Sequence, residues 1–231
     1  MRYNPNDIST WPMFRPPIMT HDVARSRDRS TAVVGGNSPC GQRLIGIAEA
    51  EELPLNLVGR ARASALAAVD RRHNCNSLIV ADLSNDESYA DALLETFGPR
   101  VIGLHITRHG NGMNFEWRPV GHGAMLVYTI GRSYLIEQLQ TELQSDQVRL
   151  ANTPALRRAY EQLNSLETEF RDTGTVYTCP PGTHDDLGIS CAMLVWAARH
   201  PHLERVWLRG IQSAQRPRRP RPDRFGWGAF T

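Results

Sequence analysis

The chain has 231 residues, of which 41% are apolar and 22% are charged, a composition that excludes a collagen-like chain and is typical of a globular protein. All 26 basic residues are arginine, which excludes a P-loop ATPase motor, because its Walker A loop needs a lysine at the nucleotide phosphates. The net charge of +2 is unevenly distributed, since residues 216–231 carry five arginines and one aspartate.

The two ends of the chain differ in composition from the rest. Residues 1–17 are rich in proline and asparagine, which predicts an irregular lead-in without the apolar core of a signal peptide. Residues 212–231 have too little apolar surface to offset the entropy of ordering, so we expect a basic, disordered tail. No apolar run is long enough to span a membrane. The four cysteines lack metal-ligand spacing, which favours a reduced protein of the cytoplasm.

The first regular elements are expected to be three strands with short connections. Apolar, β-branched residues predict strands at 18–23, at 30–36 ("STAVVGG") and at 42–52 ("QRLIGIAEAEE"). Short connections between consecutive strands favour an antiparallel meander.

The next stretch alternates helices with apolar strands. Helical periodicity covers 58–73 and 87–98, where Gly98 takes the C-terminal cap position. The runs 77–83 and 101–107 are apolar on both faces, as buried parallel strands are. The order predicts a parallel half of the sheet joined to the antiparallel half.

We expect one domain from residue 18 to about residue 211. The second half of this domain is mostly helical. Residues 108–125 are poorly periodic and form either a loop or a hairpin. The remaining elements are expected as helices at 132–146 and 154–170, short strands at 147–151 and 175–179, and a final helix from Asp186 to Arg199. Together these elements predict an α/β protein with a mixed sheet flanked by helices.

Four aspartates occupy related positions in these elements. Asp22 and Asp82 each end a strand, and Asp185 and Asp186 precede the last helix. Carboxylates at the ends of neighbouring strands project into one crevice of an open α/β sheet. A cluster of aspartates without His or Cys prefers hard cations such as Mg²⁺ or Mn²⁺, which also relieve the repulsion between carboxylates.

Each aspartate also has an ordinary structural interpretation. Asp185 or Asp186 suits the N-cap of a helix. Asp82 suits a solvated strand end, and Asp22 suits a turn. None of these positions is specific by itself, so the metal hypothesis depends on their joint placement.

The chain resembles the C-terminal nuclease domain of the large terminase subunit of tailed bacteriophages, which has an RNase H-like fold. The resemblance covers roughly residues 18–200 and follows the order of the family's motifs. It rests on "HDVARSRDRSTAVV", "LIVADLSNDESYADALLETF", "IGRSYLIEQLQTELQSDQVRL", "ALRRAYEQLNSLETEF" and "GTHDDLGISCAMLVWAA". The last stretch, with its His-Asp-Asp motif before a small-apolar helix, is the most specific.

The resemblance implies a two-ion site for Mg²⁺ or Mn²⁺. In it, Asp22 bridges the ions, and Asp82 and Asp186 each complete one side. Asp186 is preferred to Asp185 as the direct ligand, and the other carboxylate is expected to accept helix N–H groups or to bind through water. Supporting roles are expected for His184 and Asp28, and phosphate contacts for Arg25, Arg27, Arg29 and Arg108.

The implied activity is endonucleolytic cleavage of double-stranded viral DNA during genome packaging, in the cytoplasm of the host cell. One departure from the family is that only residues 1–17 precede the first strand, where large terminases carry an ATPase motor. A split gene, a fragment and a stand-alone nuclease all fit this departure. The implied partners are DNA and a separate terminase ATPase, small terminase subunit or portal protein, and the tail segment "FGWGAF" is a candidate docking element.

Two alternatives remain at this stage. A Holliday-junction resolvase would share the fold and the aspartates, although the terminase-like segment 108–170 argues against it. A non-catalytic docking module would keep the fold without metal binding, although all the expected aspartates are present.

Overall fold

The computed structural model describes residues 4–11, 13–23, 29–39, 43–73, 76–108, 112–121, 123–171 and 174–215. The helices are η1 (Ile8–Thr10), α1 (Gly59–Arg72), α2 (Tyr89–Phe97), η2 (Gly98–Arg100), α3 (Arg132–Gln144), α4 (Pro154–Asn164), α5 (Asp186–Arg199) and α6 (Pro201–Gln215). The strands are β1 (Pro17–Asp22), β2 (Thr31–Asn37), β3 (Ile45–Glu52), β4 (Leu78–Asp82), β5 (Val101–Thr107), β6 (Met113–Val120), β7 (Gly123–Gly131), β8 (Val148–Leu150), β9 (Glu167–Arg171) and β10 (Gly174–Thr178).

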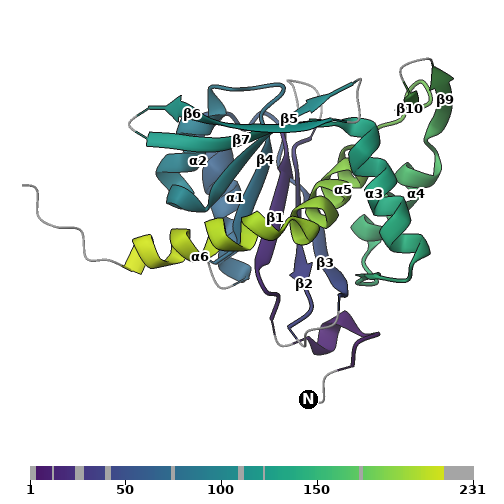
Figure 1. Cartoon of the computed structure of the whole chain (residues 1–231), viewed down its shortest axis with the longest axis horizontal. Helices are drawn as coiled ribbons and strands as arrows, with labels where there is room; N and C mark the ends of the chain where they lie inside the picture. Colours follow the sequence, from purple (N-terminus) through teal and green to yellow (C-terminus); the bar gives the residue numbers. More distant parts are fainter. Residues whose placement is uncertain are drawn as a thin grey trace, which may run out of the picture.

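Eight of the strands form one mixed sheet in the order β6-β7-β5-β4-β1-β2-β3-β8 (Figure 1). Strands β1, β2 and β3 form the expected antiparallel meander. Strands β4, β5 and β7 extend the sheet from β1 in parallel, and β6 folds back on β7 as a hairpin. The predicted mixed sheet flanked by helices is therefore confirmed. Of the two alternatives for residues 108–125, a loop or a hairpin, the structure shows the hairpin, which β6 and β7 form.

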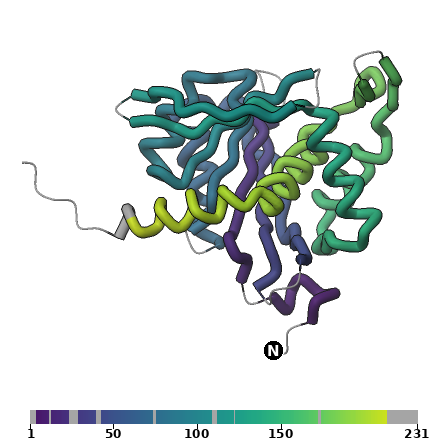
Figure 2. Tube along the Cα trace, in the orientation of Figure 1, coloured from purple at the N-terminus to yellow at the C-terminus, as the bar shows by residue number. Residues whose placement is uncertain are grey.

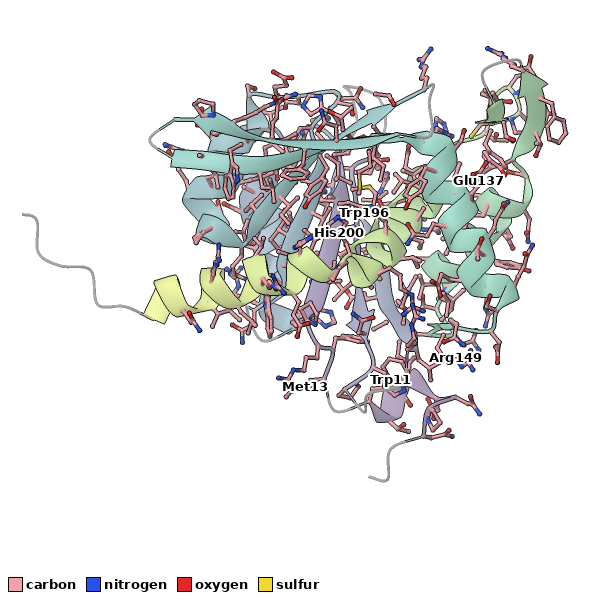
Figure 3. The ribbon with its side chains drawn as sticks, viewed as in Figure 1. Trp11, Met13, Glu137, Arg149, Trp196 and His200 are labelled. Carbon is pink, nitrogen blue, oxygen red and sulfur yellow. The ribbon has the colours of Figure 1, made fainter. Side chains whose placement is uncertain are left out.

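Helices cover both faces of the sheet and divide the core into two layers. One layer packs α1 and α2 against the sheet, and the other packs α3, α4 and α5 against the opposite face. Figure 2 shows α5 passing across β1, although the two elements lie near opposite ends of the chain. Trp196 of α5 is buried and packs edge-on against Tyr128 of β7 at 5.2 Å, with His200 beside it (Figure 3). Helix α5 is thus a central core element.

Two predicted boundaries are wrong. The helix expected at 154–170 ends at Asn164, and residues 167–171 instead form β9, which pairs with β10 in a separate hairpin. Residues 212–215, which were expected in the tail, belong to α6 instead, because this helix continues to Gln215. Residues 216–231 lie outside the described part of the chain. Among the described residues, no helix has the length and apolar character needed to cross a membrane.

Candidate active site at the strand ends

The carboxyl ends of four parallel strands meet at one edge of the sheet, and the residues there differ in charge. Asp22 ends β1, Asp82 ends β4, Arg108 follows β5, and Arg132 follows β7 as the first residue of α3. The sheet order β7-β5-β4-β1 therefore places the two arginines on one half of this edge and the two aspartates on the other.

Asp22 and Asp82 project from the same face of the sheet. They are opposite each other in the parallel register of β1 and β4, and side chains at paired positions of parallel strands share a face. Thr20, two residues before Asp22 and hence on that face, donates a hydrogen bond to the Ser190 carbonyl of α5 at 2.8 Å. Both carboxylates therefore face the layer that contains α5.

The Asp185–Asp186 pair enters the site from the start of α5. Asp186 is the first helical residue, and Asp185 occupies the N-cap position without making a side-chain capping hydrogen bond. The Asp185 carboxylate forms an ion pair with Arg132 instead. The structure thus replaces the expected contact between Asp185 and the helix N–H groups with a contact to a guanidinium.

These elements enclose a cavity of about 260 Å³, which we call the acid pocket. It is lined by Asp22, Asp82, Ser84, Asn85, Ile106, Thr107, Arg108, Arg132, Asp185, Asp186 and Ile189. All four aspartates singled out in the sequence thus line one cavity. As the side chains are placed, no group of three or more His, Cys, Asp or Glu in the described ranges is positioned to hold a metal ion.

The loop after β4 fixes the Asp82 carboxylate. Its Oδ1 accepts hydrogen bonds from the Ser84 backbone N–H at 2.9 Å and from the Ser84 hydroxyl. The same Ser84 Oγ accepts a hydrogen bond from the Ile106 N–H of β5 at 2.7 Å, and Asn85 donates to the Val23 carbonyl at 3.2 Å. Ser84 and Asn85 therefore tie the ends of β1, β4 and β5 together.

Burial makes charge costly at two positions in this pocket. It raises the pKa of the Asp82 carboxyl, although the hydrogen bonds from Ser84 oppose the rise. Burial also lowers the pKa of the Arg132 guanidinium. Cys179, Asp22 and Asp186 act in the opposite direction and raise this pKa, but they do not cancel the effect of burial. The site thus holds partly desolvated carboxylates that a bound cation would stabilise.

The other residues predicted for the site are placed less uniformly. Arg108 is exposed and lines the acid pocket. His184 is exposed and lines a neighbouring cavity, and Arg29 lies 3.9 Å from Glu52 of β3. The predicted residues Asp28, Arg25 and Arg27 lie outside the described part of the chain.

Sequence reasoning missed Arg132 and Ser84. Arg132 directly follows the apolar run "AMLVYTIG", which would have marked a strand end had residues 123–131 been recognised as a strand. Ser84 has a weaker signal, because a serine two residues after an aspartate is a common turn pattern.

The fold and the acid pocket define an α/β domain with clustered carboxylates at the ends of its central strands. No protein-family model and no curated protein sequence matches the chain. Among solved structures it is similar to the large terminase nuclease of the thermophilic phage G20c with bound magnesium, at 17% identity and a TM-score of 0.52, over 78% of this chain and 80% of that one.

The terminase nuclease domain of human cytomegalovirus, soaked with manganese and bound to an inhibitor, is a second similar structure. It is 14% identical, with a TM-score of 0.50, over 87% of this chain and 92% of that one. The chain therefore has the RNase H-like fold of viral large-terminase nuclease domains, as its sequence motifs indicate.

Proposed function

We propose that this chain is a metal-dependent endonuclease that cuts double-stranded DNA, in the manner of a terminase nuclease during viral genome packaging. The observation that carries the proposal is the gathering of Asp22, Asp82 and Asp186 around one cavity at adjacent strand ends. These carboxylates come from distant parts of the chain, and the fold is similar to that of viral terminase nucleases.

The donor set of the acid pocket suits Mg²⁺ or Mn²⁺. It offers carboxylate oxygens, with the Ser84 hydroxyl and the Asn85 amide beside them, and the described residues that line it include neither histidine nor cysteine. Asp22, Asp82 and Asp186 would hold two such ions. When bound, such ions lower the pKa of water and stabilise charge on the attacking and leaving oxygens of a phosphodiester.

The remaining charged residues of the acid pocket would orient the substrate. Arg108 and Arg132 line the same cavity as the aspartates and can donate to phosphate oxygens. Arg132 also pairs with Asp185, which leaves Asp186 as the better candidate for the third ligand. The 231 residues contain no lysine and hence no Walker A loop, so DNA translocation is not part of the activity that we propose for them.

Cleavage of supercoiled plasmid tests the proposal directly. We expect the purified chain to nick and linearise plasmid in Mn²⁺ or Mg²⁺ and to leave it intact in EDTA. Linear duplex and a four-way junction should be compared in the same buffer. An intact plasmid with both metals would contradict the nuclease, and selective cutting of the junction would favour a resolvase instead.

Ser84→Ala is expected to weaken Mn²⁺ binding by about 10–100-fold, the usual effect of losing a residue that orients a metal ligand. The physical reason is that Ser84 links Asp82 to β5 through Ile106. Isothermal titration with Mn²⁺ measures the change. Ser88→Ala is the matched control, because the exposed Ser88 donates its hydroxyl hydrogen bond to Asp86 and neither residue lines the acid pocket. Equal Mn²⁺ affinity of Ser84→Ala and wild type would show that the loop does not position a ligand.

A further inference from the structure

A second cavity, of about 440 Å³, adjoins the acid pocket, and three arginines lie in its wall. We call it the arginine pocket. Arg108 comes from the end of β5, Arg132 from the start of α3, and Arg171 from β9. Asp185, Asp186, Arg108 and Arg132 line both cavities, so the two pockets share a wall.

Arg171 reaches this cavity from outside the main sheet. Strands β9 and β10 form a separate two-stranded hairpin, which projects beyond α3 and α4 at the upper right of Figure 1. Hairpin residues Val176, Tyr177 and Thr178 also line the cavity. The hairpin therefore forms part of the wall of the arginine pocket.

Three arginines and two aspartates line the arginine pocket, so its charged residues carry a net positive charge that favours an anion. Burial lowers the pKa of the Arg132 guanidinium, Asp22 and Asp186 oppose this, and the nearby positive charge of Arg108 adds a smaller lowering. The Arg171 side chain remains 45% exposed and pairs with Glu169, two residues earlier on the same strand, at 2.6 Å. Guanidinium groups bind phosphate oxygens through paired hydrogen bonds, and a phosphate here would offset the repulsion between neighbouring arginines.

We propose that the arginine pocket binds a backbone phosphate of the DNA strand next to the phosphate held in the acid pocket, and that Arg171 is its outer contact. This inference rests on the proposed nuclease function, because it assigns the same DNA strand to both cavities. Glu169 competes with the phosphate for Arg171 and therefore weakens DNA binding in this chain.

The test measures binding without cleavage, by fluorescence anisotropy of a labelled short DNA duplex in EDTA. Arg171→Ala is expected to bind several-fold more weakly. Loss of one phosphate contact should also make the slope of log affinity against log salt shallower by about 0.9. Between about 50 and 200 mM salt, the variant should therefore lose about threefold less affinity than wild type loses. Glu169→Gln is expected to change affinity in the opposite direction and bind more tightly.

Two variants on α4 control for net charge alone. Arg157→Ala removes an exposed arginine that bonds to Asn152, and Glu161→Gln removes an exposed glutamate, both outside the arginine pocket. We expect each to change the affinity less than its counterpart on β9. If Arg171→Ala matches Arg157→Ala, or Glu169→Gln fails to bind more tightly than Glu161→Gln, the arginine pocket is not a phosphate site.

The outcomes for the two proposals can be told apart. If wild type fails to cut plasmid but Arg171→Ala still weakens duplex binding, the nuclease proposal fails and the phosphate site stands. If wild type cuts plasmid but Arg171→Ala binds and cuts as wild type does, the nuclease stands and the phosphate site fails. Unchanged melting temperatures would confirm that the exposed substitutions leave the fold intact.

Discussion

Asp186→Asn is expected to reduce metal-dependent plasmid cleavage by more than about a hundredfold, whereas Asp185→Asn should reduce it by about tenfold or less. The larger value exceeds the usual loss from a residue that only orients a metal ligand. The difference follows from the start of α5, where Arg132 pairs with the Asp185 carboxylate. Cleavage rates at saturating Mn²⁺ measure both effects.

The matched pair also tests which aspartate acts. Both substitutions remove one negative charge from adjacent positions, so a loss specific to Asp186→Asn cannot come from net charge. Equal losses of cleavage in both variants would instead mean that both aspartates are needed to bind the ion. Full activity of Asp186→Asn would contradict the ligand assignment.

Mn²⁺ at about 100 times its dissociation constant is expected to stabilise the wild-type fold by about 2.7 kcal/mol, which raises Tm by about 5–11 °C for a chain of this size. Asp82→Asn should abolish this response. It should also raise Tm in EDTA, because Asp82 is buried opposite Asp22 and its charge is costly there. Asparagine keeps the shape of the side chain and an oxygen that accepts from Ser84.

Differential scanning fluorimetry with and without Mn²⁺ measures both parts of this second prediction. Asp91→Asn on the exposed side of α2 is the control and should keep the wild-type metal response. A lower Tm of Asp82→Asn in EDTA, together with an unchanged rise in Mn²⁺, would mean that the ion binds elsewhere.

The central strands and the start of α5 could be predicted because their sequence signals are local. Apolar runs that stop at Asp22 and Asp82 mark strand ends, and the apolar helix after Asp186 has no other environment than the core. That the two strands are neighbours was only an expectation, since register depends on tertiary contacts. The structure confirms it by pairing Asp22 with Asp82.

The errors arose where tertiary contacts override local preference. Residues 165–170 contain leucine and glutamate, which favour helix, yet 167–171 leave α4 and pair with β10. Helix α6 was not predicted, because Pro201 comes two residues after the last residue of α5 and Gly210 interrupts the helical pattern. Its packing compensates, since Leu203 is fully buried and Gly210 lies against Arg100.

The four carboxylates of the candidate site were predicted from the sequence, whereas among its arginines Arg108 was predicted and Arg132 and Arg171 were not. Acidic residues at strand ends suggest a cation site from the sequence alone. One arginine among 26 suggests no particular role until the fold shows which residues lie beside it. The pairing of Arg132 with Asp185 and the approach of Arg171 from the hairpin depend on packing between distant segments. No local pattern encodes these contacts.

The crossing of α5 over β1 has a consequence for the timing of activity during synthesis. The acid pocket needs positions 22, 82 and 186, and α5 docks through Ser190 on Thr20. A chain still attached to the ribosome can pair β1 with β4 while Asp186 and α5 are still untranslated or inside the exit tunnel. The complete set of carboxylates thus forms only after α5 has emerged from the ribosome, so a nascent chain that stalls before that point has no assembled acid pocket.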